Sequence, residues 1–142
     1  MSLAKILYST SATATGGRDG RAATADKQLD VKLTTPRELG GAGGDGTNPE
    51  QLFAAGYSAC FLNAMKFAAM QNKSPMPSDT SLEAVVGIGQ NETGGFDLQV
   101  DLRVTAPSMT REAAHALVQQ AHSICPYSNA TRGNIEVTLT VV

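Results

Sequence analysis

The sequence predicts an α+β domain in which antiparallel sheets pack against two helices. Several segments alternate apolar and polar residues with the period of a strand, and two longer segments carry apolar residues at helical spacing. The chain has 142 residues, of which 42% are hydrophobic, so it can form one core, and we expect a single domain over residues 1–142. The expected order of elements is β-β-β-α-β-β-α-β.

Three strands are expected before the first helix. Residues 3–15 are rich in β-branched types and predict the first strand. The sequence GGRDG at 16–20 predicts a turn, and residues 21–26 the returning strand. Residues 29–35 alternate apolar and polar side chains and predict the third strand. The glycine-rich stretch 40–46 predicts a flexible loop and lacks the Gly-Lys-Ser/Thr ending of a nucleotide-binding loop.

The first helix has a well-marked start. Thr47 and Glu50 fit a capping box, and Asn48 before Pro49 fits an N-cap followed by proline at the first helical position. The helix is expected to run to about Asn72. It is apolar on nearly all sides, which is typical of a helix buried all round. One small chain has limited means to bury such a helix, so we expect a homodimer with this helix buried at its centre.

The second half of the chain predicts a hairpin, a helix and a last strand. Residues 81–90 and 96–106 flank the turn sequence ETGG. Thr110 is expected to begin the second helix and Pro126 to end it, and residues 134–142 alternate strictly, as a strand does. The expected buried stripe of the second helix consists of Ala114, Leu117, Val118, Ala121 and Ile124.

Composition argues against several classes of protein. The net charge of −2 and the lack of a basic run exclude nucleic acid as an expected partner. The N-terminus lacks a signal-peptide pattern, and the longest uncharged stretch, 51–65, is too short to cross a membrane. With 17% charged residues, part of the surface is expected to be buried against a partner. We therefore expect a cytoplasmic protein, in a compartment where disulfides are usually transient and catalytic.

The two cysteines lie in different settings. Cys60 lies inside the uncharged part of the first helix, and Cys125 lies where the second helix ends. They form neither a Cys-x-x-Cys motif nor a four-ligand metal pattern, and since the chain has only two cysteines, any disulfide within it must join this pair. Both lie on apolar helix faces, which can meet in a core. The alternative is that both are inert, space-filling cysteines.

A reactive Cys60 needs a nearby positive charge. Burial raises the pKa of a thiol, and a mid-helix position receives little help from the helix dipole. Cys125, at a helix C-terminus, is disfavoured as a thiolate. The first helix carries no charge between Glu50 and Lys66, so the cation must come from elsewhere in the fold. The candidates are Arg18, Arg21, Arg37, Arg103, Arg111 and Arg132.

Four segments resemble the organic hydroperoxide resistance proteins (Ohr), in the wider group that includes the osmotically inducible protein OsmC. They are ATATGGRDGRA, LDVKLTTPRELGG, GTNPEQLFAAGYSACF and CPYSNATRGNIEVTLTVV. The resemblance covers essentially the whole chain. It implies an OsmC/Ohr-like fold and an intertwined homodimer.

The resemblance also implies roles for four residues. Cys60 matches the peroxidatic cysteine and Cys125 the resolving cysteine. Arg18 matches the arginine that faces the reactive sulfur, and Glu50 the glutamate that holds this arginine; a guanidinium can stabilise a thiolate and a carboxylate can fix the arginine. Glu50 and Cys60 are ten residues apart on one helix, about 15 Å, so one arginine head cannot touch both. Arg18 and Glu50 are therefore expected to act on the Cys60 of a partner subunit.

The activity that the resemblance implies is a thiol-dependent peroxidase that reduces organic hydroperoxides, including those of fatty acids, to alcohols. Cys60 becomes a sulfenic acid, Cys125 condenses with it to a disulfide, and an external dithiol, expected to be a dihydrolipoyl group on a lipoylated protein, reduces the disulfide. No metal, flavin or haem is needed. Three alternatives remain open: an OsmC-like peroxidase with a different substrate range, a thiol redox sensor without turnover, and a binding module with two structural cysteines.

Overall fold

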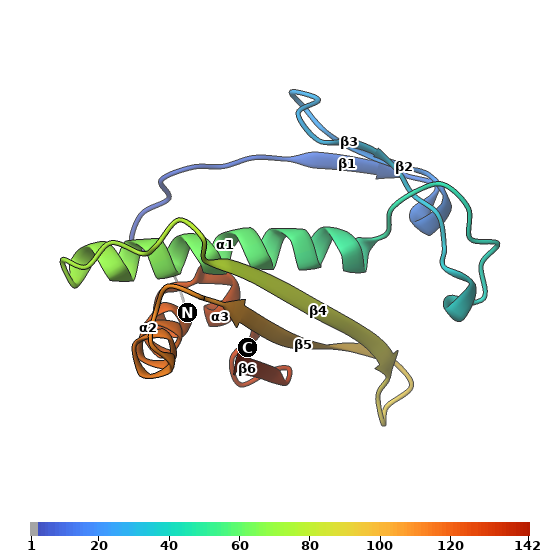
Figure 1. The fold of residues 1–142 in the computed structure, drawn as a ribbon. Coiled ribbons are helices and arrows are strands. Elements are labelled where there is room, and N and C mark those ends of the chain that lie inside the picture. Colours follow the sequence, from blue (N-terminus) through green and yellow to red (C-terminus); the bar gives the residue numbers. More distant parts are fainter. Residues whose placement is uncertain (1–2) are drawn as a thin grey trace. The chain divides into compact units, whose positions relative to one another are not determined.

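The computed structural model describes residues 3–142, which divide into two compact units. The N-terminal unit ends at Pro49, and the C-terminal unit runs from Glu50 to Val142. The strands and the two long helices follow one another in the predicted order (Figure 1). The mixed α+β class is confirmed.

The N-terminal unit is built on a small antiparallel sheet. Strands β1 (Ala12–Thr15), β2 (Arg21–Thr24) and β3 (Asp30–Lys32) lie in the order β1-β2-β3. A 3-10 turn, η1 (Gly17–Asp19), joins β1 to β2, and a second, η2 (Arg37–Leu39), follows β3. The predicted turn at 16–20 and the loop at 40–46 are confirmed.

The η1 turn depends on its glycines. Gly16 and Gly17 have φ angles of 74° and 59°, in the left-handed region that favours glycine. A Cβ on Gly20 would lie 1.6 Å from the carbonyl oxygen of Thr15, so no other residue fits there. The side chain of Asp19 accepts a hydrogen bond from the Thr35 backbone N–H at 3.0 Å, which ties the turn to the chain beyond β3. Arg18 is thus carried on a turn of fixed shape.

The predicted strand over residues 3–15 is too long. Its regular part begins at Ala12, because β2 offers partners only to Ala12–Thr15, and a strand needs a hydrogen-bonded neighbour. Residues 3–11 form no strand. Their large apolar side chains are exposed, among them Leu7 at 88% and Tyr8 at 80%.

The C-terminal unit packs two helices on one face of a second sheet. Helix α1 (Pro49–Gln71) precedes the hairpin of β4 (Ser81–Gln90) and β5 (Phe96–Thr105). Helix α2 (Arg111–Ile124), helix α3 (Pro126–Thr131) and strand β6 (Val137–Val141) follow. The sheet order is β4-β5-β6, and the predicted hairpin is confirmed by the antiparallel pairing of β4 with β5.

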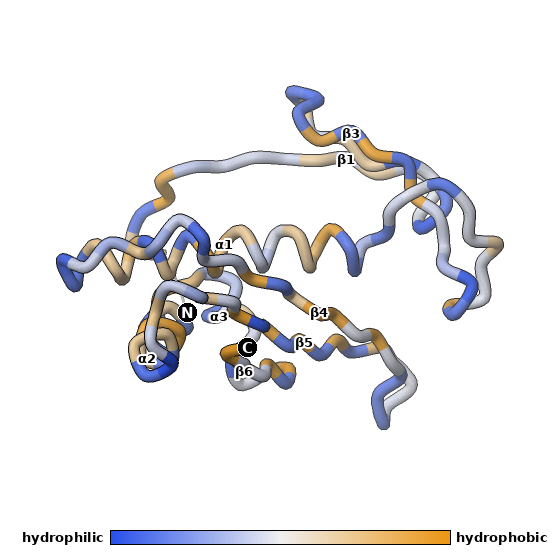
Figure 2. The backbone as a smooth tube through the Cα atoms, in the orientation of Figure 1, coloured by the Kyte–Doolittle hydropathy of each residue, from blue (hydrophilic) through white to orange (hydrophobic). Residues whose placement is uncertain are grey.

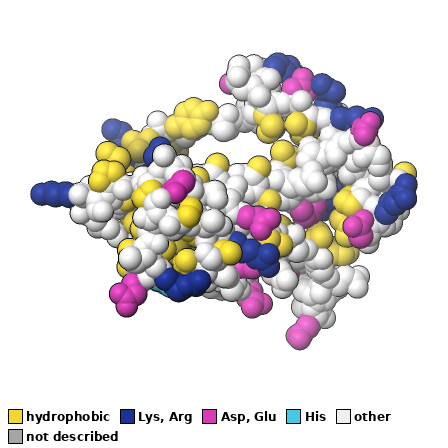
Figure 3. Space-filling view, viewed as in Figure 1, with side chains coloured by type: hydrophobic (Ala, Val, Ile, Leu, Met, Phe, Trp, Pro, Cys, Tyr) yellow, Lys and Arg dark blue, Asp and Glu magenta, His cyan; other side chains and the backbone are white. Residues whose placement is uncertain are grey.

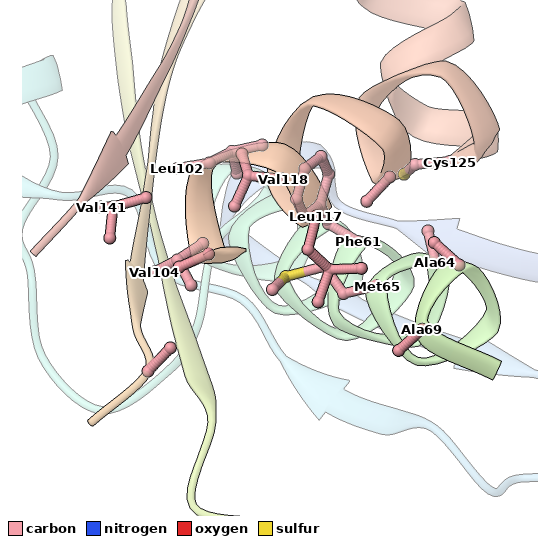
Figure 4. Close-up of a cluster of buried hydrophobic side chains, with 14 of the residues drawn as sticks. Phe61, Ala64, Met65, Ala69, Leu102, Val104, Leu117, Val118, Cys125 and Val141 are labelled. Atoms are coloured by element: carbon pink, nitrogen blue, oxygen red, sulfur yellow. The ribbon is translucent and has the colours of Figure 1, made fainter. Parts of the chain in front are cut away.

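The core of this unit lies between the sheet and the helices. Val100, Leu102 and Val104 alternate along β5 and are buried, an alternation that Figure 2 shows as hydropathy. They face Phe61 and Met65 of α1 and the predicted stripe of α2 (Figure 4). In that stripe Ala114, Leu117, Val118 and Ala121 are buried, and Ile124 is half-buried.

The predicted antiparallel pairing is confirmed for β1–β2, β2–β3 and β4–β5 but not for β6, at one edge of the second sheet. Strand β6 pairs with β5 in parallel, with Leu102 opposite Leu139. The chain travels from β5 to β6 through α2 and α3, and a crossover connection of this kind joins parallel strands. The prediction that Pro126 ends the second helix is confirmed, but Pro126 also opens α3, which was not predicted. Proline suits the first helical position because no intrahelical partner awaits its missing N–H.

Helix α1 is buried on one face of the described chain rather than all round. Tyr57, Phe61 and Met65 are fully buried, whereas Phe67 is 51% and Met70 71% exposed. Hydrophobic side chains accordingly reach the surface in Figure 3, where acidic and basic side chains are interspersed among them. Burial of the second face by a partner subunit stays a prediction. Within residues 3–142, no helix is long and apolar enough to cross a membrane.

Candidate active site

The structure brings the two cysteines together. Cys60 projects from the middle of α1, Cys125 lies between α2 and α3, and their Sγ atoms are 3.6 Å apart. Both are free thiols, and the Cys125 thiol donates a hydrogen bond to the Cys60 sulfur. Because a disulfide has an S–S length of about 2.05 Å, the two sulfurs need to approach by only about 1.5 Å to form one.

Burial distinguishes the two thiols. Cys125 is completely buried in the core, beside α1 (Figure 4), whereas Cys60 is half-buried. A molecule arriving from solvent can therefore reach the Cys60 sulfur but not that of Cys125. This arrangement orders the two thiols, with Cys60 in front and Cys125 behind it.

Cys125 is the joint between two helices. Its backbone N–H donates to the carbonyl of Ala121 at 2.8 Å, in the last turn of α2. Its carbonyl accepts from the N–H of Asn129 at 2.9 Å, in the first turn of α3. Cys125 thus lies at the C-terminus of one helix, as predicted, and also at the N-terminus of a second. The orientation of α3 therefore affects where the Cys125 sulfur points.

The surroundings of Cys60 act on its pKa in opposite directions. Burial raises the pKa of the Cys60 thiol, the backbone N–H of Tyr127 lowers it, and the neighbouring Cys125 thiol raises it; the net shift is upward. A raised pKa leaves less thiolate at neutral pH, and the thiolate is the nucleophile. The surroundings within this unit therefore disfavour the Cys60 thiolate.

An apolar depression opens over Cys60. It has a volume of about 260 Å³, slightly below the usual range of small-molecule sites. Cys60, Asn63, Ala64 and Phe67 of α1 line one side, and Ile124 and Pro126 line the other. Phe67 is its largest apolar lining side chain. Met65, on the same helix, lies in the core instead, where it is completely buried.

Helix α3 adds residues that the sequence reasoning missed. The Tyr127 ring stacks on Phe53 at a centroid distance of 5.9 Å and lies 5.6 Å from the ring of Tyr57. The Tyr57 hydroxyl shares hydrogen bonds with Ser128 and Thr131 of α3. One feature of the sequence could have pointed to the Tyr57–Ser128 contact. Tyr57 is three residues before Cys60, and Ser128 is three residues after Cys125.

The other two predicted site residues lie on separate elements. Arg18 is in the η1 turn of the N-terminal unit, and Glu50 is in the first turn of α1. Helix α1 is uninterrupted, so Glu50 lies about 15 Å from the level of Cys60 in its own chain. Their pairing, and their approach to a partner's Cys60, stay predictions. Within residues 3–142, no group of three or more His, Cys, Asp or Glu side chains is placed to hold a metal ion.

Comparison with known proteins identifies the family. The family model for OsmC-like proteins matches residues 41–140, which is more than half of the chain. The chain belongs to the OsmC-like family. Its relatives include an organic hydroperoxide resistance protein of Xanthomonas axonopodis pv. citri, which is 62% identical over 137 residues that cover 96% of both chains. The resemblance to the Ohr members of the OsmC-like family is thereby confirmed.

Solved structures of the OsmC-like family share this fold. An organic hydroperoxide resistance protein from Legionella pneumophila superposes with a TM-score of 0.91 at 47% identity, covering 96% of this chain and 98% of that one. A putative one from Vibrio cholerae, with captopril bound in one of its active sites, gives 0.91 at 48% identity over 97% and 94%. OhrB of Bacillus subtilis gives 0.88 at 42% identity over 96% and 100%.

Proposed function

We propose that this protein is a cysteine-based peroxidase that reduces organic hydroperoxides to alcohols. The observation that carries the proposal is the ordered thiol pair, in which accessible Cys60 lies 3.6 Å from buried Cys125. A single reactive thiol would suffice for modification by peroxide, but a second thiol within reach provides a route back. The names of the Xanthomonas, Legionella and Bacillus relatives support organic hydroperoxides as the substrate class.

The proposed reaction has three steps. The Cys60 thiolate attacks one peroxide oxygen, the O–O bond breaks, and the alkoxide leaves with a proton as the alcohol; Cys60 is left as a sulfenic acid. The Cys125 thiol then attacks the Cys60 sulfur, which releases water and forms the Cys60–Cys125 disulfide. An external dithiol then reduces this disulfide by exchange. Its two thiols become a disulfide, and Cys60 and Cys125 return to free thiols. We propose a dihydrolipoyl group as that dithiol, with no metal, flavin or haem.

The depression favours an organic substrate over hydrogen peroxide. Its walls are mainly apolar, through Phe67, Ile124 and Pro126. An alkyl or aryl group that packs against these side chains leaves water, which stabilises the complex in proportion to the apolar area buried. Hydrogen peroxide has no such group. Long-chain substrates, such as fatty-acid hydroperoxides, exceed a volume of about 260 Å³, so only the part of the chain next to the peroxide group would fit in the depression.

The proposal includes a second subunit. Cys60 has a raised pKa, so a fast peroxidase requires a positive charge that stabilises its thiolate. We propose that Arg18, held by Glu50, supplies this charge to Cys60 of the partner subunit in a homodimer with two shared sites. The exposed apolar face of α1, which includes Phe67 and Met70, fits burial in such a dimer. A stable monomer with full peroxidase activity would contradict the shared site.

A turnover assay tests the proposed function. With cumene hydroperoxide as substrate and dihydrolipoamide as reductant, we expect many equivalents of cumyl alcohol per protein chain. Hydrogen peroxide should give a kcat/KM lower by about tenfold or more, because it lacks the apolar group worth about 1.4 kcal/mol or more of binding. A protein that is oxidised once by peroxide but does not turn over with the dithiol would be a redox sensor, and the proposal would be wrong.

Arg18→Ala should move the pH dependence of Cys60 reactivity. If Arg18 stabilises the thiolate, its loss raises the pKa of Cys60 further, so the alkylation rate at pH 7 should fall by about tenfold or more while the rate at high pH stays similar. The measurement is the rate of iodoacetamide alkylation against pH. Arg103→Ala is the matched control, because Arg103 is an exposed arginine paired with Asp101 on β5. An unchanged profile in Arg18→Ala would remove Arg18 from the site.

A further inference from the structure

Three buried hydroxyl groups connect α1 to α3. The Tyr57 hydroxyl shares a hydrogen bond of 2.9 Å with Ser128 and one of 3.1 Å with Thr131. Tyr57 and Ser128 are completely buried, and Thr131 is 6% exposed. We name Tyr57, Ser128 and Thr131 the hydroxyl cluster. Because the cluster is buried, water cannot replace a hydroxyl that is removed. The remaining hydroxyl groups then lose a hydrogen-bond partner.

The hydroxyl cluster runs alongside the thiol pair. On α1, Tyr57 lies one turn before Cys60, and Ser128 lies one turn after Cys125, so the cluster and the thiol contact bridge the same two segments. Beside the cluster, the Tyr127 ring packs on Phe53 and lies 5.6 Å from the Tyr57 ring. Two polar bridges and one aromatic contact thus hold α3 in place beside α1.

Gly56 allows this close packing. A Cβ at Gly56 would lie 2.9 Å from the Tyr127 hydroxyl oxygen and 3.3 Å from its ring. Gly56 lies inside α1, where glycine costs about 1 kcal/mol relative to alanine. A glycine at this cost is explained by the ring that lies over it. Residues of both helices therefore fix the position of α3 on α1: Gly56 from α1 and Tyr127 from α3.

We propose that the hydroxyl cluster is a positioning device that keeps Cys125 within reach of Cys60, so that oxidised Cys60 is resolved before a second hydroperoxide reaches it. The inference rests on the proposed function. Ser128 is held by Tyr57, and Ser128 and Cys125 belong to the same turn of chain, so fixing one fixes the other. Tyr57, Ser128 and Thr131 are positioning residues, because they act on the Cys60 chemistry only through the placement of Cys125.

Two reactions of the Cys60 sulfenic acid compete. In the first, the Cys125 thiol attacks its sulfur, giving a disulfide and water. In the second, another hydroperoxide transfers an oxygen atom to it, giving a sulfinic acid and a second alcohol. The first is intramolecular, so its rate depends on how often the two sulfurs are within reach, and small displacements lower it strongly. The second depends on the concentration of hydroperoxide and on access to Cys60.

Tyr57→Phe tests the inference with the smallest change. It keeps the aromatic ring and removes the hydroxyl that joins Ser128 to Thr131. We expect the first oxidation of Cys60 to stay within about twofold of the wild-type rate, while the ratio of sulfinic acid to disulfide rises by about tenfold at the same excess of cumene hydroperoxide. Mass spectrometry of the Cys60 peptide measures this ratio. Stopped-flow measurement of hydroperoxide consumption gives the rate of the first oxidation of Cys60.

Two further variants separate positioning from stability. Tyr57→Phe with Ser128→Ala removes both partners of one bridge, so its melting temperature should lie closer to wild type than that of Tyr57→Phe, yet its product ratio should stay raised. Val104→Ala weakens the core on β5, away from the cluster, and should lower the melting temperature with an unchanged ratio.

The outcomes are distinct. A wild-type ratio in Tyr57→Phe, or an equal rise in Val104→Ala, would overturn the inference while leaving the peroxidase proposal intact. A wild-type protein that forms no Cys60–Cys125 disulfide would overturn both.

Discussion

Replacing Cys60 by serine is expected to abolish peroxide turnover, with a fall in kcat on the order of 10³-fold or more, as for the loss of other enzymatic nucleophiles. A serine hydroxyl is not ionised at neutral pH, whereas a thiol can supply a thiolate. The change is nearly isosteric at a half-buried position, so the fold should persist. The measurement is alcohol formation from cumene hydroperoxide in the presence of dihydrolipoamide.

Ser58→Ala, on the same helix, is the control for this experiment. Ser58 lies two residues before Cys60, and its hydroxyl bonds to the carbonyl of Ala55 within α1. Ser58→Ala should keep turnover within about threefold of wild type, because it changes α1 without touching the thiol pair. If the serine variant of Cys60 retained turnover, Cys60 could not be the nucleophile, and the account of the site would be wrong.

Replacing Cys125 by serine should separate the two chemical steps. Cys60 stays available to the hydroperoxide, so a first equivalent of alcohol should still be released at close to the wild-type rate. The sulfenic acid then has no thiol 3.6 Å away, and excess hydroperoxide should carry it to the sulfinic acid, which dithiols do not reduce. Turnover should therefore stop, and the Cys60 peptide should gain two oxygen atoms.

The same experiment has a clear contrary result. Sustained turnover of Cys125→Ser under excess hydroperoxide, with no sulfinic acid on Cys60, would show that Cys125 does not resolve the intermediate. Wild-type protein under identical conditions is the control and should accumulate the disulfide when no dithiol is present. Together the two cysteine variants assign an order to the thiols, which burial alone only suggests.

Local chemistry explains which elements could be predicted. The Thr110 cap of α2 accepts from the Ala113 N–H, as a capping residue should, and Pro49 opens α1 as expected. The hairpin of β4 and β5 follows from two alternating runs around a short turn. These features depend on neighbouring residues, so the sequence pattern is sufficient to find them.

The predictions that were wrong concern features set by segments far apart in the sequence. Strand β1 is short because its partner β2 is short, and β6 runs parallel to β5 because of the route that the chain takes through α2 and α3. Helix α3 has six residues and no apolar period, and its proline looked like a stop signal alone. No local pattern contains this information.

The sequence likewise predicted only part of the site, and the rest depends on tertiary packing. That Cys60 and Cys125 can meet follows from their apolar helix faces, but their separation of 3.6 Å depends on packing between residues 65 positions apart. The hydroxyl cluster joins residues 71 and 74 positions apart, and serine, threonine and tyrosine are too common for such a pairing to be recognised in advance. Only the one-turn spacing of Tyr57 from Cys60 and of Ser128 from Cys125 pointed toward it.

One equivalent of hydroperoxide is expected to convert the Cys60–Cys125 thiol pair into a disulfide. The direct measurement is peptide mapping by mass spectrometry after reduced protein has reacted with one equivalent of cumene hydroperoxide without dithiol. We expect one cross-linked peptide pair containing Cys60 and Cys125, a loss of two hydrogen atoms, and one equivalent of cumyl alcohol. Two cysteines that both remain open to alkylation, with the hydroperoxide unconsumed, would contradict it.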